Sequence, residues 1–301
     1  MPELPDLELY VTHLNRRIAG ARLERVRVAG WNLVRTTEPA LAEAAGRVVV
    51  DVRRVGKRLV FGLEGGLFLA LHLMISGRLH WKPAGAPIPK RTGLAAFDFA
   101  PGTLLLTEAS TKQRAALHLL RDAAALAALD AGGIEPLSMS AEALAETLAR
   151  EDHTLKRALT DPRLFAGIGN AYSDEILHAA QLSPVQLTGK LGDADMARLY
   201  GATRETLDVW TDTLRREFGD RFPGAGEITA FRPGFAVHGR YGQDCPTCGT
   251  PVQRIRYADN ETNYCPTCQT GGRLLADRSL SRLLKSDWPK TLEEMEMRKK
   301  S

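Results

Sequence analysis

Residues 245–268 read CPTCGTPVQRIRYADNETNYCPTC, and this stretch decides the fold of the C-terminal part of the chain. It holds all four cysteines of the protein as two Cys-x-x-Cys pairs: Cys245, Cys248, Cys265 and Cys268. Two matched pairs on a β-hairpin are typical of tetrahedral zinc, and they favour zinc over the competing interpretation, a redox-active dithiol. Because the protein supplies all four ligands, we expect one structural Zn²⁺ rather than a catalytic metal.

The segment before this module has a helical pattern, from Ser140, a predicted helix cap, to about residue 218. Within it, residues 160–177 read TDPRLFAGIGNAYSDEIL, in which Asp161-Pro162 ends one helix and Asn170 opens the next. The glycines before Asn170, ending at Gly169, predict a tight turn whose N–H groups suit a phosphate. A lone Gly-x-Gly also suits an ordinary helix–helix connection, so the other segments must support this interpretation.

The first part of the chain is rich in short strand-like runs. Between residues 22 and 108, runs of branched residues alternate with turn signals such as Glu64-Gly65-Gly66 and Pro101-Gly102. This density of short strands predicts a β-sandwich or a β-barrel. Before the strands we expect a helix that is capped by Asp6 and ended by Gly20.

The bulk composition excludes few classes of function. The 40 basic and 36 acidic residues give a formal net charge of +4, which is a weak indication of a nucleic-acid partner. No apolar run approaches the roughly 20 residues that span a bilayer. The N-terminal run MPELPDLELY is acidic and helical in pattern, so we expect no signal peptide and a cytoplasmic location.

Four segments together resemble the formamidopyrimidine-DNA glycosylase / endonuclease VIII family. They are Pro2-Glu3-Leu4-Pro5-Asp6, Lys57 in a strand, GIGNAYSDEIL at residues 167–177, and Val237-His238-Gly239-Arg240 before the zinc module. They follow in the family's order over roughly residues 2–269. The resemblance implies an α+β multidomain fold: an N-terminal β-sandwich with flanking helices, then a helical helix-two-turn-helix domain with a C-terminal zinc ribbon.

The expected domain limits follow from this order of elements. Residues 1–130 would form the catalytic β-sandwich domain, and residues 137–234 the helix-two-turn-helix DNA-binding domain. Residues 235–270 would form the zinc-ribbon finger. Residues 271–301 would form a C-terminal extension, whose basic stretch from Ser279 to Lys285 suits a helix on the ribbon or a flexible DNA-binding tail.

The chemistry of Pro2 can be argued from its structure alone. Removal of Met1 leaves a secondary amine with a pKa near 8, of which a minority is unprotonated at neutral pH. This amine can attack the sugar C1′ of a damaged nucleotide, and the resulting iminium is a fixed cation that promotes strand cleavage by elimination. Glu3 would protonate the sugar ring oxygen. Lys57 would hold one phosphate, while Asn170 and Gly169 would hold another, although a lone lysine is more often a solvated charge.

The resemblance therefore implies a bifunctional DNA glycosylase and abasic-site lyase that excises oxidised bases with β- and δ-elimination. We expect a monomer that acts on damaged double-stranded DNA, and on single-stranded or distorted DNA as a further substrate class. On DNA it would be associated with the nucleoid. The identity of the damaged base and the opposite-base preference stay open.

The chain departs from the family's pattern at the DNA-contacting positions. Asn260 stands where the family commonly has an arginine in the ribbon, so Arg254 is a candidate replacement. Ile75 aligns with the family's inserted methionine, with Met74 one residue earlier. The second loop, residues 110–115, offers two basic side chains to DNA, Lys112 and Arg114, but no aromatic wedge.

Two other functions compete with this interpretation. The first is a lesion- or structure-binding member of the family, with lyase activity but weak or altered base excision, which the departures motivate. The second is a zinc-ribbon transcription or RNA factor, which explains the cysteines but not the N-terminus.

Overall fold

The computed structural model describes residues 1–30, 32–224, 226–257, 260–276 and 288–300, and the chain divides into two compact units. The first unit consists of residues 1–133 and 209–230, and the second of residues 134–208 and 231–301. Residues 209–230 therefore belong with the first unit, although the expected limits assign them to the helical domain. The expected limits stay a proposal.

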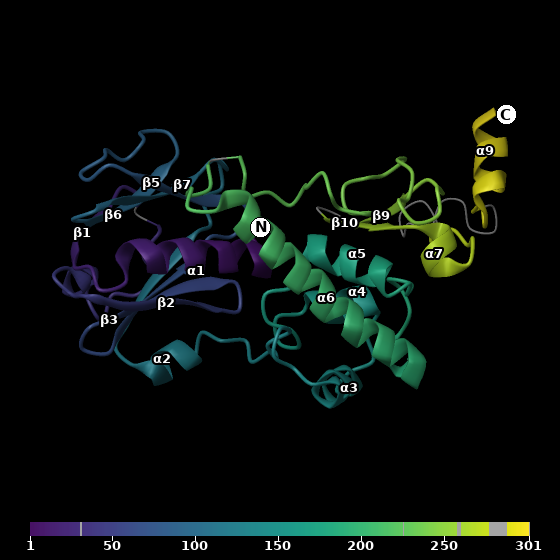
Figure 1. Ribbon diagram of the computed structural model, residues 1–301, viewed down its shortest axis with the longest axis horizontal. Coiled ribbons are helices and arrows are strands. Elements are labelled where there is room, and N and C mark those ends of the chain that lie inside the picture. Colours follow the sequence, from purple (N-terminus) through teal and green to yellow (C-terminus); the bar gives the residue numbers. More distant parts are fainter. Residues whose placement is uncertain (31, 225, 258–259, 277–287, 301) are drawn as a thin grey trace. The chain divides into compact units, whose positions relative to one another are not determined.

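The first unit is a sandwich of two four-stranded antiparallel sheets, and Figure 1 shows its layers. One sheet has the order β1 (Leu23–Val28), β6 (Gly93–Phe99), β7 (Gly102–Glu108) and β5 (Gly77–Lys82). The other has the order β2 (Val49–Val55), β3 (Arg58–Leu63), β4 (Leu67–His72) and β8 (Ala116–Leu120). The sandwich fold is confirmed, and the open choice between sandwich and barrel is settled. The sequence did not predict β8, because its leucine-rich run leads directly into alanine-rich helical sequence.

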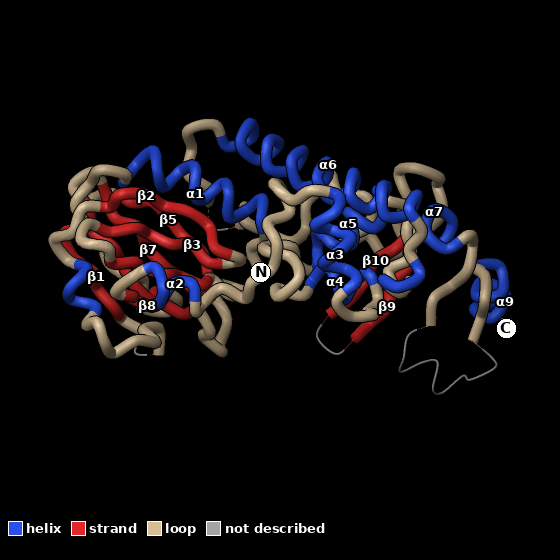
Figure 2. The backbone as a smooth tube through the Cα atoms, turned by 90° about the horizontal axis from the view of Figure 1, so that it is seen from below, coloured by secondary structure: helices blue, strands red, loops and turns tan. Residues whose placement is uncertain are grey.

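The core of the first unit lies between the two sheets. Phe61 of β3 and Phe97 of β6 stack across it with ring centroids 6.2 Å apart. Helix α1 (Leu4–Ile18) runs alongside the sheets (Figures 1 and 2) and buries one stripe of its surface in the same core, including Leu7 and Leu14. Each fully buried side chain of this kind contributes about 1.5–3 kcal/mol, so the core holds α1 firmly on the sandwich.

Helix α1 begins earlier than a cap at Asp6 predicts, and that prediction is wrong. The capping position is Glu3, and the helix starts at Leu4. Asp6 lies in the first turn, where its Oδ2 accepts the Glu3 N–H at 2.9 Å. A carboxylate there satisfies a backbone donor that the helix leaves without a partner. Gly20 follows the helix with φ +79°, a backbone conformation that favours glycine, and this end of the helix is as predicted.

The outer face of the second sheet is also covered. Helix α2 (Ala123–Ala127) places Leu126 in a cluster with Val60 of β3 and Ala70 of β4. This second layer explains why β3 is apolar on both faces. Within the same unit, a 3₁₀ turn (Leu41–Ala44) precedes β2, and Leu214 and Phe218 from the end of α6 (Asp193–Phe218) join the main core.

The second unit is mostly helical. Its elements are α3 (Ala141–Ala149), α4 (Leu155–Thr160), α5 (Asn170–Ala179), a 3₁₀ turn (Thr188–Lys190), the first part of α6, β9 (Gln253–Tyr257), β10 (Asn260–Tyr264), α7 (Pro266–Thr270) and α9 (Leu292–Lys300). Ser140 caps α3 as predicted, since its Oγ accepts the Ala143 N–H at 3.2 Å. The β9–β10 hairpin lies against α5 (Figure 2).

Two further expectations concern the tail and membranes. The stretch from Ser279 to Lys285 lies outside the described residues, so neither of its two interpretations is tested. Within the described ranges, no helix combines the length and the apolar character that crossing a membrane requires.

Candidate functional site

The N-terminal residues of the first unit lie at the start of α1. Pro2 and Glu3 are both buried, Glu3 being only 3% exposed. With Met1 present, burial lowers the pKa of the terminal amino group below its usual value of 8.0. Nearby charges act on it as well: Glu3 and Asp6 raise its pKa, and Arg78 and Lys57 lower it. A neutral amine is the nucleophilic form, so this setting suits a nucleophile at the chain's start.

Lys57 lies in a turn and not in a strand, so the predicted strand position is wrong. The strands β2 and β3 form a hairpin in which Val55 pairs with Arg58, which leaves Gly56 and Lys57 as its two-residue turn. Gly56 has φ +57°, as tight hairpin turns require. The turn projects Lys57 beyond the sheet, where its charge acts on the terminal amine.

Arg78 is a residue of this site that the sequence did not single out. It follows Gly77 at the start of β5, and its charge lowers the pKa of the terminal amine. Its guanidinium donates to the carbonyls of Ile75 at 3.1 Å, Gly77 at 2.7 Å and Ile228 at 2.8 Å. An arginine in a basic, strand-rich sequence carries no local signal for such a role.

The two predicted DNA-contacting residues between β4 and β5 differ in exposure. Ile75 is 57% exposed, whereas Met74 is half-buried and has φ +53°. A left-handed conformation costs a residue other than glycine roughly 1–2 kcal/mol. The turn therefore exposes Ile75 to solvent, and the unfavourable backbone conformation of Met74 needs other contacts to hold it. DNA contact by either residue stays a prediction.

The second predicted loop, residues 110–115, is held at its base by a buried carboxylate. Glu108 Oε2 accepts the N–H groups of Arg114 at 2.9 Å and Ala115 at 3.0 Å. Lys112 and Arg114 are exposed, so the structure leaves both side chains accessible.

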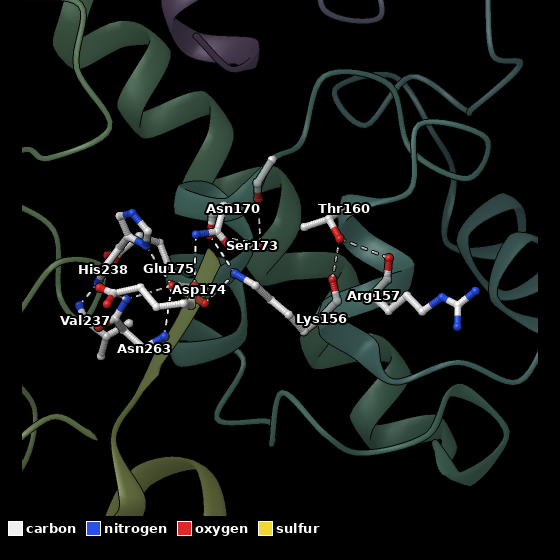
Figure 3. A network of polar contacts seen from close by, with 12 residues as sticks. Lys156, Arg157, Thr160, Asn170, Ser173, Asp174, Glu175, Val237, His238 and Asn263 are labelled. Atoms are coloured by element: carbon white, nitrogen blue, oxygen red, sulfur yellow. Dashed lines mark hydrogen bonds and ion pairs between the residues drawn. The ribbon is translucent and has the colours of Figure 1, made fainter. Parts of the chain in front are cut away.

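A buried polar network organises the second unit (Figure 3). Its centre is the fully buried carboxylate of Asp174 on α5. Asp174 accepts from Lys156 Nζ at 2.5 Å, His238 Nδ1 at 2.7 Å and the Asn263 N–H at 3.1 Å. These partners come from α4, from the segment before the ribbon and from β10. One carboxylate therefore joins the helical domain to the zinc ribbon.

The neighbouring carboxylate, Glu175, makes a second connection. It accepts backbone N–H groups from Ala236 at 2.6 Å, Val237 at 2.9 Å and His238 at 2.8 Å. Burial raises the pKa of Glu175, while these donors act against the rise. The Val237-His238 segment is thus held by α5 through its backbone.

The predicted phosphate-binding turn is part of the same network. Helix α5 starts at Asn170, as the sequence predicts, and Gly169 is its capping residue. The Asn170 carbonyl accepts from Lys156 Nζ at 2.6 Å, and its Nδ2 donates to the Glu261 carbonyl at 2.9 Å. The turn is therefore fixed to both α4 and β10, and its binding of phosphate stays a prediction.

The four cysteines form the expected zinc cluster. Their sulfurs all lie within 4.8 Å of one another, with 3.9 Å between Cys245 and Cys268 and 3.4 Å between Cys248 and Cys265. Tetrahedral Zn–S bonds of about 2.3 Å separate sulfurs by about 3.8 Å, so the cluster fits one structural Zn²⁺. His178 Nε2 lies 3.3 Å from Cys245 Sγ, which suits an outer N–H donor to a zinc-bound thiolate.

The remaining ribbon residues differ in their surroundings. Arg254 lies 3.4 Å from Glu261 and holds its guanidinium over the Tyr241 ring, 4.3 Å from the ring centroid. Asn260 is exposed at the first position of β10. Arg254, the predicted replacement for the arginine that Asn260 lacks, therefore already contacts other residues of the ribbon.

The sequence did not single out the network residues Lys156, Asp174, Glu175, His238 and Asn263 by their role. The only local signal is the adjacent pair of acids in NAYSDEIL, within a helix whose other face is apolar. Two acids in a helix are usually a solvated face, and only their burial identifies them as a hub.

In comparisons with known proteins, three domain families match successive parts of the chain. The formamidopyrimidine-DNA glycosylase N-terminal domain matches residues 1–114, and the formamidopyrimidine-DNA glycosylase H2TH domain matches residues 133–213. A zinc finger found in FPG and IleRS matches residues 242–271. A formamidopyrimidine-DNA glycosylase of Roseiflexus sp. (strain RS-1) is 37% identical over 279 residues, which cover 89% of this chain and 100% of that protein.

Other relatives match less of the chain or at lower identity. An uncharacterized formamidopyrimidine-DNA glycosylase-like protein of Mycobacterium tuberculosis is 46% identical over 154 residues, 51% of this chain and 94% of that protein. Among solved structures, wild-type Lactococcus lactis Fpg (MutM) with an oxidized pyrimidine containing DNA is 26% identical, with a TM-score of 0.77. The match covers 89% of this chain and 100% of that one. A mutant of the same protein with a Fapy-dG containing DNA is 25% identical, with a TM-score of 0.78 and the same coverage.

Proposed function

Because the chain belongs to the formamidopyrimidine-DNA glycosylase family, we propose that it excises oxidised bases from DNA and cleaves the strand at the abasic site. The observation that carries this proposal is the setting of the N-terminus: Pro2 and Glu3 buried at the start of α1, with Lys57 and Arg78 acting on the terminal amine. The solved L. lactis relatives hold DNA with an oxidised pyrimidine or Fapy-dG, which supports damaged double-stranded DNA as the substrate.

The reaction begins with the Pro2 amine, which Met1 removal would free. Its nitrogen lone pair forms a bond to the sugar C1′ as the bond from C1′ to the base breaks. The base departs with the electrons of that bond, and the amine nitrogen gives up its proton. Glu3 protonates the ring oxygen, and the ring opens to an iminium between Pro2 and C1′. Loss of a proton from C2′ then expels the 3′ phosphate, and loss of a proton from C4′ in a second elimination expels the 5′ phosphate. Water finally hydrolyses the iminium and restores the amine.

Other residues of the chain would bind and orient the DNA. Lys57 is assigned one phosphate beside the lesion, and Asn170 with Gly169 a second. Asp6 positions Glu3, because its carboxylate accepts the backbone N–H of Glu3. Ile75, and to a lesser extent Met74, would enter the base stack.

Borohydride trapping on an abasic duplex tests this function. We expect a covalent protein–DNA adduct that peptide mapping places at residue 2, and an intact mass without Met1. Active enzyme that retains Met1 would exclude the proline mechanism, because its amine would then be an amide. An adduct mapped to Lys57 would identify a different nucleophile.

A second candidate function is lesion binding with lyase activity but altered base excision. Arg254 contacts Glu261 and Tyr241, and Asn260 is exposed. Both observations favour a mode of DNA binding by the ribbon that differs from the family's. A panel of duplexes, each with one damaged base, separates the two functions. Release of an oxidised base supports the glycosylase, whereas strand cleavage only at preformed abasic sites supports the alternative.

A further inference from the structure

The turn between β4 and β5 is held by a side chain of the strand that precedes it. His72, the last residue of β4, accepts the Met74 N–H at its Nδ1, 3.0 Å away. Met74 has the left-handed φ of +53°, so this bond forms at the residue where the backbone is least favourable. Ile75 follows directly and is exposed.

The rest of the turn is tight. The Gly77 N–H donates to the Leu73 carbonyl at 2.9 Å, and a Cβ at Gly77 would lie 2.2 Å from that carbonyl oxygen. Arg78 holds the Ile75 carbonyl at 3.1 Å. The backbone on both sides of Ile75 is therefore held by these contacts and by the imidazole of His72.

The imidazole can accept this bond only when it is neutral. Burial first, and then the charges of Arg58, Lys57 and His118, together lower the pKa of His72 to about 4. At neutral pH, Nδ1 therefore keeps its lone pair for Met74 and the ring proton resides on Nε2. The charge of Lys57 lowers the pKa of both His72 and the terminal amine. The turn and the N-terminus are therefore affected by the same positive charge.

We propose that His72 is a positioning residue for DNA distortion: by accepting the Met74 N–H, it fixes the turn that presents Ile75 to the base stack. This inference rests on the proposed function, in which a nucleotide leaves the stack and a side chain fills the gap. Filling the gap offsets part of the unstacking cost, which a misdirected Ile75 would not do. His72 takes no part in bond breaking.

The test compares His72→Leu, which has no acceptor, with His72→Asn, whose Oδ1 can stand near the position of Nδ1. Both are assayed on the same abasic oligonucleotide as a duplex and as a single strand, where there is no stack to enter. We expect His72→Leu to slow borohydride trapping about tenfold on the duplex, because small misplacements carry large kinetic costs, and to trap the single strand like wild type. His72→Asn should restore most of the duplex rate, and Ile75→Ala should share the pattern of His72→Leu.

Two further measurements keep the inference testable. Fluorescence of 2-aminopurine beside the abasic site reports insertion without any chemistry, and its rise should be lost in His72→Leu. The double variant His72→Leu/Met74→Gly should recover it, because glycine adopts a positive φ without help. The inference is overturned if His72→Leu keeps the wild-type ratio of duplex to single-strand rates and its fluorescence rise, or if His72→Asn is as impaired as His72→Leu. If wild type does not trap at all, the proposed function fails, while the fluorescence still decides the role of His72.

Discussion

The two compact units hold their important side chains in opposite ways. In the first unit, Pro2, Glu3 and Asp6 lie close together in sequence, and Asp6 accepts the Glu3 N–H. In the second unit, Asp174 gathers Lys156, His238 and Asn263 from separate segments. The first arrangement is set by one helix start, whereas the second exists only when the helices and the ribbon have packed.

This difference predicts different consequences of mutation. In the proposed mechanism the N-terminal amine reacts with DNA, so changes there should affect chemistry and leave folding intact. The side chains around Asp174 are nearly excluded from water, Lys156 being 12% exposed, so changes there should affect the stability of the second unit. The predictions below test this division, from the largest expected effect to the smallest.

Loss of the zinc cluster should have the largest effect. Structural zinc contributes on the order of 10 kcal/mol to small zinc modules, so Cys265→Ser should unfold the ribbon and weaken DNA binding. Metal analysis should find one zinc per chain in wild type and little in the variant. Hydrogen exchange should stay slow in the sheets of the first unit and become fast in residues 245–268. Thr267→Ser, between two ligands, is the matched control; fresh wild-type protein without zinc would contradict the prediction.

Asp174→Asn should come next. Removing one partner of a buried ion pair costs about 3–5 kcal/mol, because Lys156 would lose its counter-charge. Urea unfolding of the second unit measures the loss. Asp195→Asn, in the same unit, is the matched control: Asp195 pairs with Arg198, whose side chain is 48% exposed, and exposed pairs contribute about 0–1 kcal/mol. Equal losses in the two variants would show that the network is not the hub that its burial suggests.

Pro2→Gly should affect chemistry and not folding. Loss of the secondary amine removes the permanently cationic iminium, and we expect trapping on abasic duplex to fall by about 10²-fold or more. Thermal unfolding and DNA affinity of Pro2→Gly should match wild type. Pro5→Ala, which removes a proline from the same turn, is the control. A variant that traps as fast as wild type would place the nucleophile elsewhere.

Lys57→Ala should have the smallest effect, with two signatures. One phosphate contact fewer should reduce the slope of log affinity against log salt by about 1. With Met1 present, the charge of Lys57 lowers the pKa of the terminal amine, and we expect the same direction for the Pro2 amine, so loss of Lys57 should raise its pKa. Because the neutral amine reacts, the acidic limb of the trapping profile should move to higher pH.

Lys90→Ala, in an exposed loop, provides the control for Lys57→Ala. An unchanged salt slope together with an unmoved pH limb would remove Lys57 from the site.

The sequence by itself determined the parts of this protein that depend on neighbours along the chain. The cysteine spacing determined the zinc cluster, the short strand-like runs limited the first unit to a sandwich or a barrel, and Asn170 after Gly169 determined the start of α5. Each is a local pattern, because metal knuckles, strand periodicity and helix caps all act over a few residues.

Only the tertiary structure decided the rest. It moved Lys57 from a strand to a hairpin turn, added Arg78 to the N-terminal site, and turned Asp174 from one acid among many into a buried hub. The physical reason is that the role of a charged side chain depends on its burial and on its partners. Those partners lie far along the chain, as Lys156 and His238 do for Asp174, and no local pattern specifies which of them will meet.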